Sequence, residues 1–466
     1  MKLPAGARIN IVGAGLAGAL LALLLARRGL AVALYERRAD PRQARPERGR
    51  SINLALAARG MRALERAGVL ESVRPLLIPM RGRMVHDRAG TVALQPYGQR
   101  EHEVIFSVGR ADLNRVLIEA AARHGNVSVH FNQQCLGADI GGQRLSFRDD
   151  AGGGEYQLPL TATIATDGAG SAIRASLAAA QLLRVREEWL DHDYKELTIP
   201  AAVGGALERH ALHIWPRGGF MLIALPNTDG SFTATLFLPR EGPGSFATLT
   251  TPQAVHEFFA REFADALPWL RDLPAQFADH PQGQLGTVYA TPWHVGGQAL
   301  LLGDAAHAIV PFHGQGMNAA FEDCAELDAL FAASRDWQEL FARFEESRRP
   351  NTTAIAQMAL ENYLEMRDAV LDAGFVRRKA LAMALERRFP ERFIPRYSMV
   401  MFHPEISYAE AQRRGALQER LLHELDRPGG GEAAADSALA ERLIRERLPP
   451  LGEAVAVAPR GGEEPR

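Results

Sequence analysis

The chain has 466 residues, 47% of them hydrophobic and 23% charged, and its formal net charge is -2. A single hydrophobic core stops growing at about 250 to 300 residues, so this length predicts two or three domains of an ordinary globular protein. The near-neutral charge argues against a basic face for nucleic acid. Cys135 and Cys324 are the only cysteines and show no metal-ligand spacing, so we expect no metal site and a reducing, cytoplasmic location.

The N-terminal segment predicts a βαβ unit. Its apolar pattern is continuous over residues 8–12, helical over 16–28 and continuous again over 31–35. The connecting turn and the helix start carry the residues of a dinucleotide-binding loop, namely Gly13, Gly15, Leu16 and Gly18. Such glycines permit a tight turn, and the helix N–H groups then meet a pyrophosphate. A signal peptide or membrane anchor is disfavoured, because the apolar run is shorter than the roughly 18 residues that a span needs.

Glu36 strengthens the nucleotide interpretation. It follows the second predicted strand, where a carboxylate can accept a hydrogen bond from a ribose 2'-hydroxyl. This favours FAD or NAD, because the same carboxylate repels a 2'-phosphate. Arg37 and Arg38 leave an NADP interpretation open, and a turn without a ligand is the other alternative.

The hydrophobic pattern changes in the middle of the chain. Short alternating segments predict an antiparallel sheet, after which a buried strand over 299–302 and a helix over 316–330 restore the α/β pattern. We therefore predict an α/β fold with an inserted antiparallel-sheet domain and C-terminal helices. The expected limits are 1–181 with 285–360 for a discontinuous nucleotide domain, 182–284 for the sheet domain, 361–451 for a helical region and 452–466 for a flexible tail.

A second candidate cofactor segment follows the late buried strand. Asp304 stands at the strand end, the usual place for ligand contacts in open sheets, although an Asp that caps the next turn is the alternative. Residues 311–318 follow and include His313, Gly316, Met317 and Asn318. Their glycines let the backbone approach a planar ring, and the positive end of the next helix would stabilise an anionic reduced flavin.

These motifs, in this order, resemble the group A FAD-dependent aromatic hydroxylases of the para-hydroxybenzoate hydroxylase fold. The segment 164–171 with Arg174 resembles the Asp-Gly motif of that family, although Ala165 and Thr166 replace its usual Gly-Ala. The resemblance implies a Rossmann-like FAD domain. The implied cofactor contacts are Gly13, Gly15, Leu16, Gly18, Glu36, Arg37, Ala55, Arg110, Asp304, Gly316, Met317 and Asn318. For Arg110, a solvated residue in the first turn of a helix is the alternative.

Other segments resemble the kynurenine 3-monooxygenase family over nearly the whole chain. They are 49–56, 80–86, 94–98, 211–216, 358–363 and 392–399. The segment after Gly452 departs from the apolar C-terminal anchor of eukaryotic members, which implies a form without a membrane span. By residue-by-residue match, Arg83 is implied to bind a substrate carboxylate, with hydrogen bonds from Tyr97, Asn362 and Tyr397. The alternatives are a surface arginine and tyrosines that only pack.

The resemblance implies hydroxylation of L-kynurenine with NADPH and O2, through a flavin C4a-hydroperoxide. The cofactor carries the chemistry, so His313 is at most a proton relay and is otherwise structural. No second glycine-rich βαβ unit occurs for NADPH, whose contacts stay unassigned. Hydroxylation of another aromatic acid or amine and a non-enzymatic FAD redox sensor remain alternatives, and the sequence leaves a homodimer open.

Overall fold

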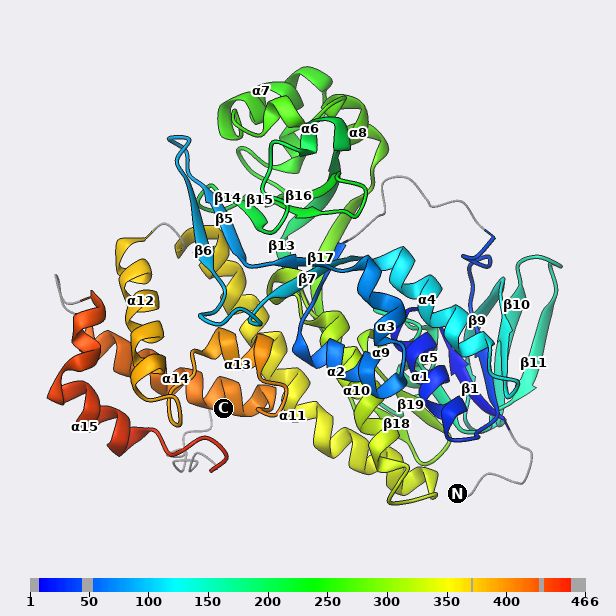
Figure 1. Ribbon diagram of the computed structural model, residues 1–466. Helices are drawn as coiled ribbons and strands as arrows, with labels where there is room; N and C mark the ends of the chain where they lie inside the picture. Colours follow the sequence, from blue (N-terminus) through cyan, green and yellow to red (C-terminus); the bar gives the residue numbers. More distant parts are fainter. Residues whose placement is uncertain (1–7, 44–52, 370–371, 427–430, 454–466) are drawn as a thin grey trace, which may run out of the picture. The chain divides into compact units, whose positions relative to one another are not determined.

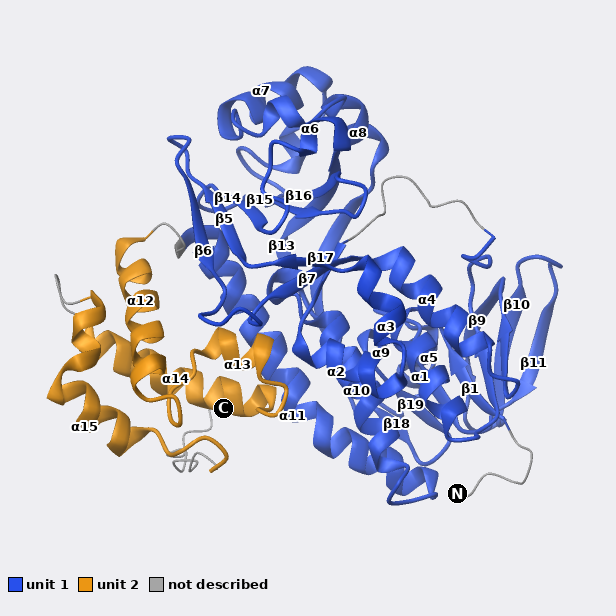
Figure 2. Ribbon diagram, in the orientation of Figure 1, with its two compact units in different colours: residues 1–368 blue, residues 369–466 orange. Residues whose placement is uncertain are grey.

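The computed structural model describes residues 8–43, 53–369, 372–426 and 431–453. The chain forms two compact units, Met1–Asp368 and Ala369–Arg466 (Figures 1 and 2). Part of the resemblance segment 49–56 and nearly all of the expected tail 452–466 lie outside the described residues. No helix within the described ranges has the length and apolar character to cross a bilayer.

A six-stranded sheet forms the core of the first unit. Its strand order is β18-β19-β12-β1-β2-β8, and all neighbours except β18 and β19 are parallel. The strands are β1 (Ile9–Val12), β2 (Val32–Tyr35), β8 (Val127–His130), β12 (Thr163–Ala165), β18 (His294–Val295) and β19 (Ala299–Leu301). The early βαβ unit and the late strand thus share one sheet, which confirms the predicted α/β fold.

Helices pack around this sheet. The helices α1 (Leu16–Arg27) and α4 (Arg110–Ala122) contact its strands, α10 (Gly316–Leu330) contacts α1, and α5 (Ala172–Ala179) contacts the strand β9 (Gln133–Asp139). Every residue of α1 from Gly18 to Ala26 is buried, since the helix contacts α4, α10 and α2 (Ala58–Ala67). A helix that is apolar on all sides is expected in such a position. This packing explains the apolar run that resembles a membrane anchor in the sequence.

A seven-stranded sheet has the order β17-β13-β16-β15-β14-β5-β6. Its strands are β5 (Gly82–His86), β6 (Val92–Pro96), β13 (Arg184–Ile199), β14 (Leu212–Pro216), β15 (Met221–Pro226), β16 (Phe232–Pro239) and β17 (Gln282–Thr291). All pairs are antiparallel except β14 with β5, where Leu212 pairs with Arg83. The inserted segment is therefore joined by two strands from earlier in the chain. The helices α6 (Ala201–Gly204), α7 (Pro252–Glu262) and α8 (Leu273–Asp279) gather at one side (Figure 1).

Smaller elements complete the first unit. Two three-stranded sheets comprise β9 (Gln133–Asp139), β10 (Arg144–Asp149) and β11 (Glu155–Pro159), and β3 (Asn53–Leu56), β4 (Ile78–Met80) and β7 (Ile105–Gly109). The remaining helices are α3 (Leu70–Val73), α9 (Asp304–His307), the short 3-10 turns η1 (Arg74–Leu76), η2 (Phe246–Thr248), η3 (Leu267–Trp269) and η4 (Pro311–His313), and the long α11 (Trp337–Leu364), which continues into the π-helical η5 (Glu365–Ala369).

The second unit is helical. It contains α12 (Ala373–Arg388), α13 (Arg396–Phe402), α14 (Tyr408–Leu425), the 3-10 segment η6 (Gly431–Asp436) and α15 (Ala438–Arg447). Leu385, Phe393, Leu421 and Ile444 form part of its own core.

Candidate active site

The glycine loop after β1 has the shape that the sequence predicts. Gly13 has φ of +99°, and a Cβ there would stand 2.5 Å from the Thr166 carbonyl oxygen. A Cβ on Gly18 would collide with the Gly13 carbonyl, whereas a Cβ on Gly15 would meet nothing within 4 Å. Gly13 and Gly18 are therefore required by packing, and Gly15 faces open space. Thr166, one of the departures from the family motif, supports the loop by donating to the Gly13 carbonyl at 2.8 Å.

Glu36 is tied to this loop. Its carboxylate accepts hydrogen bonds from the backbone N–H of Ala14 at 2.9 Å and of Arg38 at 3.0 Å. Each oxygen of an ionised carboxylate can accept more than one bond, so capacity remains for a ribose hydroxyl. The neighbouring Arg37 is exposed.

Helix α4 approaches the same loop. Asn114 donates to the Ala14 carbonyl at 2.9 Å, and Arg110 is the exposed first residue of this helix. The sequence analysis did not single out Asn114. Its signal would have been a polar side chain one turn after Arg110 on a helix that otherwise packs through Leu113 and Leu117.

Asp304 follows β19, which lies on the other side of β1 from β2 in the strand order. It is the exposed first residue of α9, and its carboxylate forms no hydrogen bond or ion pair within the described part of the chain. Gly303 before it has φ of +62°, a conformation that favours glycine. The turn therefore presents a carboxylate outward from the end of a buried strand.

Asn318 connects the second glycine segment to β3. Its side-chain amide donates to the carbonyls of Ala55 and Gly314, each at 2.8 Å, and its oxygen accepts from the Ala57 N–H at 2.9 Å. Gly314 has φ of +64°, and a Cβ there would lie 2.9 Å from the Ala55 Cβ. The side chain predicted to contact the cofactor thus holds together two segments that the sequence assigns to the site.

The N-terminus of α10 is open. Gly316 and Met317 begin the helix, are half-buried, and receive no side-chain cap from Gln315. The first N–H groups of a helix have no partner within the helix and carry its positive end. This end can therefore bind a negatively charged or strongly polar group.

Asp167, in the Asp-Gly motif after β12, has an unusual carboxyl group. Burial raises the pKa of Asp167, although hydrogen bonds from Ser171 and nearby N–H groups act against it. One oxygen accepts from the Ala172 N–H at 2.9 Å, while the other is buried and has no hydrogen-bond partner in the described structure. A polar group of a bound molecule could satisfy that oxygen.

Together these features fit FAD. The strands β1, β2, β12 and β19 are parallel, so their carboxyl ends share one edge of the sheet, where ligands bind in open α/β folds. The glycine loop, Glu36, Asp167 and Asp304 all follow those ends. This edge offers hydrogen-bond acceptors for ribose and ribityl hydroxyls, and it offers helix N-termini for the pyrophosphate and the ring.

A second cluster surrounds Arg83 on β5. The buried guanidinium donates to the Glu365 carboxylate at 2.8 Å and to the Asn362 side-chain oxygen at 3.2 Å. The amide of Asn362 donates in turn to the Phe312 carbonyl at 2.7 Å. The fold therefore brings together Arg83 and Asn362, which the sequence assigns to one site, next to the glycine segment.

Glu365 is the residue that sequence reasoning missed in this cluster. It lies three positions after Asn362, where α11 passes into η5, and so faces the same way on the helix. That spacing was the available signal. Its partner Arg83 is 282 residues away in the sequence.

Tyr97 and three aromatic rings lie near these residues in the fold. Tyr97 is buried directly after β6, and its N–H donates to the Arg81 carbonyl at 3.0 Å, two residues beyond the pair Arg83 and Gln95. The Phe312 ring stacks on Tyr363 with centroids 4.0 Å apart and contacts the Phe237 ring at 4.9 Å.

Two other predicted site residues, His313 and Tyr397, lie in other elements. His313 is buried in η4, directly after Phe312. Tyr397 belongs to the second unit, where it is half-buried in α13. A role for either in the chemistry stays a prediction.

Comparisons with known proteins agree with this geometry. Residues 7–359 match the family model described as FAD binding domain. The chain is 49% identical over 445 residues to a kynurenine 3-monooxygenase of Stenotrophomonas maltophilia, covering 95% of this chain and 97% of the relative. It is 47% identical over 445 residues to one of Myxococcus xanthus, covering 95% and 96%.

Solved structures show the same fold at low identity. A 2-methyl-3-hydroxypyridine-5-carboxylic acid oxygenase matches with a TM-score of 0.63 at 19% identity, over 78% of this chain and 93% of that one. The p-nitrophenol 4-monooxygenase of Pseudomonas putida matches with a TM-score of 0.61 at 17% identity, over 89% and 96%.

Proposed function

Because the chain belongs to the kynurenine 3-monooxygenase family, we propose that it is an FAD-dependent, NADPH-consuming monooxygenase that converts L-kynurenine and O2 to 3-hydroxykynurenine. The observation that carries the substrate assignment is the cluster of Arg83, Asn362 and Glu365 beside the glycine segment. A buried cation and a carboxylate at one place suit a ligand that carries both charges.

Kynurenine has an α-amino acid head and an aromatic amine. In the proposed complex, the planar guanidinium of Arg83 binds the substrate carboxylate through a fork of two hydrogen bonds. Glu365 takes the ammonium group that this exchange brings close to it. Asn362 and Tyr97 add hydrogen bonds and fix the orientation of the head, and a hydrogen bond from Tyr397 of the second unit stays a prediction from the sequence.

The aromatic ring of the substrate needs an apolar slot. Phe237, Phe312 and Tyr363 offer one next to Asn362, whose amide holds the Phe312 carbonyl. Such walls exclude water and hold the ring in one orientation, which is the main contribution a protein makes when the cofactor carries the reaction. His313 has at most a proton-relay role.

The cofactor assignment uses the first cluster. FAD, when bound, accepts a hydride from NADPH and delivers one oxygen atom of O2 to the substrate. Gly13, Gly15, Leu16 and Gly18 would bind the pyrophosphate, Glu36 and Arg37 the adenosine end, and Asp304 the ribityl chain. Ala55, Arg110, Gly316, Met317 and Asn318 would line the rest, with the positive end of α10 favouring negative charge on the reduced ring.

The experiment is to purify the protein, record the flavin spectrum and measure NADPH oxidation with L-kynurenine, followed by product analysis. We expect substrate-stimulated oxidation and a matching amount of 3-hydroxykynurenine. Anthranilate, a simple aromatic acid, serves as the comparison substrate. NADPH oxidation without hydroxylated product would contradict the proposal and favour a redox sensor, and faster hydroxylation of anthranilate would contradict the substrate assignment.

A further inference from the structure

A buried carboxylate stands behind the Asp304 turn. Asp323, in α10, is fully buried, and one of its oxygens accepts hydrogen bonds from the Gly303 N–H at 3.3 Å and from His307 Nε2 at 2.6 Å. Its other oxygen accepts from Arg348 Nε at 2.7 Å. Asp323 therefore binds the residue before Asp304 and a side chain three positions after it.

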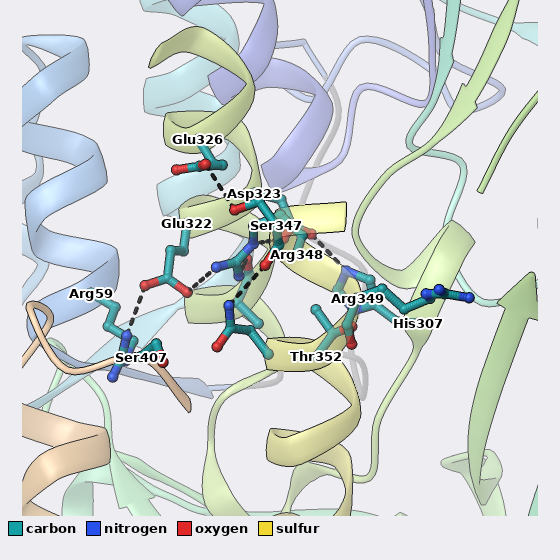
Figure 3. Close-up of polar contacts among 12 residues, drawn as sticks. Arg59, His307, Glu322, Asp323, Glu326, Ser347, Arg348, Arg349, Thr352 and Ser407 are labelled. Carbon is teal, nitrogen blue, oxygen red and sulfur yellow. Dashed lines mark hydrogen bonds and ion pairs between the residues drawn. The ribbon is translucent and has the colours of Figure 1, made fainter. Parts of the chain in front are cut away.

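This carboxylate belongs to a charged network (Figure 3). Arg348 also pairs with Glu322 at 2.6 Å, and Glu322 pairs with Arg59 at 2.8 Å. Burial alone would raise the pKa of Asp323, but the charges of His307 and Arg348 outweigh burial and lower it. These contacts favour the carboxylate form of Asp323, which can accept hydrogen bonds from the Gly303 N–H, His307 Nε2 and Arg348 Nε.

The same turn is held from the other side. Arg174, which follows the Asp-Gly motif, donates from Nη1 to the Ala305 carbonyl at 2.9 Å. The groups on both sides of Asp304 therefore have protein partners, while the Asp304 carboxylate itself is exposed. A fixed turn whose central carboxylate forms no hydrogen bond or ion pair with the described residues is preorganised for a ligand that donates hydrogen bonds.

We propose that Asp323, acting through Gly303 and His307, is a positioning residue that aims the Asp304 carboxylate at the ribityl chain of FAD. The proposal rests on the proposed contact between Asp304 and FAD. In this proposal α10 supports two contacts with FAD. Its N-terminus lies at the ring, and its residue Asp323 holds the turn that carries Asp304. Gly303 allows this close approach, because a Cβ there would lie 3.2 Å from the Ala320 Cβ of the same helix.

The test measures FAD and ADP affinity of apoprotein by isothermal titration calorimetry. Asp323→Asn is expected to weaken FAD binding about tenfold to a hundredfold, the usual cost of losing an outer-sphere partner in metal sites. ADP binding is expected to stay within about twofold, because ADP uses the glycine loop and Glu36 and not this turn. A loss of the same size for both ligands would overturn the proposal, since it would indicate a general loss of structure.

Asp328→Asn is the matched control. Asp328 lies in the same helix, is buried, and pairs with Arg66 at 2.6 Å and with Arg28, and none of its hydrogen bonds or ion pairs with the described residues reaches the turn. Its substitution is expected to lower the melting temperature and to leave FAD affinity unchanged. An equal loss of FAD affinity in both variants would overturn the proposal.

Two further variants keep the Asp323 charge pair with Arg348, in case Asp323→Asn does not fold. His307→Ala is expected to weaken FAD binding, and His307→Gln, whose amide can donate to Asp323, to restore most of it. A full-strength FAD affinity in His307→Ala would overturn the proposal.

A double-mutant cycle separates the proposal from its premise. If Asp323 acts through Asp304, the pair Asp304→Ala with Asp323→Asn should lose no more FAD affinity than Asp304→Ala alone. Additive losses would overturn the inference only. Unchanged FAD affinity in Asp304→Ala would overturn the cofactor contact, and with it the inference.

Discussion

Replacement of Arg83 by Met tests the substrate site most directly. The side chain is buried, with 4% of it exposed, and its partner Glu365 is 26% exposed. Methionine preserves most of the volume and removes the charge. The apoprotein should fold, because Glu365 can turn toward water when the guanidinium is gone.

The expected effect can be worked from the contacts. Truncating one partner of a buried, hydrogen-bonded charge pair costs about 2 to 5 kcal/mol. Taking about 3 kcal/mol for the lost carboxylate fork gives a KM for L-kynurenine that rises roughly 100-fold, since each 1.4 kcal/mol is a factor of ten. The kcat should fall less, because the ring is held by other residues.

The assay is steady-state hydroxylation of L-kynurenine and of kynuramine, its analogue without the carboxylate. The wild type should prefer kynurenine strongly, and Arg83→Met should treat the two alike. Arg217→Met is the control, because Arg217 is also buried but pairs with Asp265 at 3.5 Å. If Arg83→Met lost activity toward both substrates equally and kept the preference for kynurenine over kynuramine, the carboxylate assignment would be wrong.

Three other outcomes follow from the structure. Gly314→Ala should weaken FAD binding measured by calorimetry, because the residue has φ of +64° and its Cβ would meet Ala55 at 2.9 Å. Glu36→Gln should weaken it about tenfold, near 1.4 kcal/mol, by loss of the charged acceptor. Burial lowers the pKa of His213 from 6.5 to about 4. Below pH 6.5 only the unfolded chain takes up this proton, so the free energy of unfolding falls by up to about 1.4 kcal/mol per pH unit between pH 6.5 and pH 4. His213→Gln should flatten that slope in urea unfolding, and the exposed His256→Gln should not.

The sequence predicts the nucleotide part of the fold well because its signals are local. The first βαβ unit occupies fewer than 30 consecutive residues, and Gly13 and Gly18 are required by contacts within that stretch and with Thr166. The return of β19 to the same sheet follows from its buried apolar run and the Gly303–Asp304 step. Such local patterns specify the backbone geometry of the segments in which they occur.

Other features depend on contacts between distant segments. The residues near Arg83 in the sequence do not predict its ion pair with Glu365. The parallel pairing of β5 with β14 joins segments of different predicted domains. Asn318 shows the same limit. Its neighbours suggest a ligand contact, but its side chain is committed to the backbone of Ala55 and Gly314.

Two of the ion pairs among the described residues, Arg348–Asp323 and Arg83–Glu365, differ in a way that suits their proposed tasks. Arg348 and Asp323 are 5% and 0% exposed, and breaking such a pair costs about 3 to 5 kcal/mol, so it stays closed and holds a turn. Glu365 keeps 26% exposure, so it can leave Arg83 at a smaller cost when another carboxylate arrives. A simple aromatic acid would leave Glu365 without a cation, whereas an amino acid supplies its own ammonium. The Arg83 cluster should therefore discriminate in favour of zwitterions, and Glu365→Gln should reduce the preference for kynurenine over anthranilate.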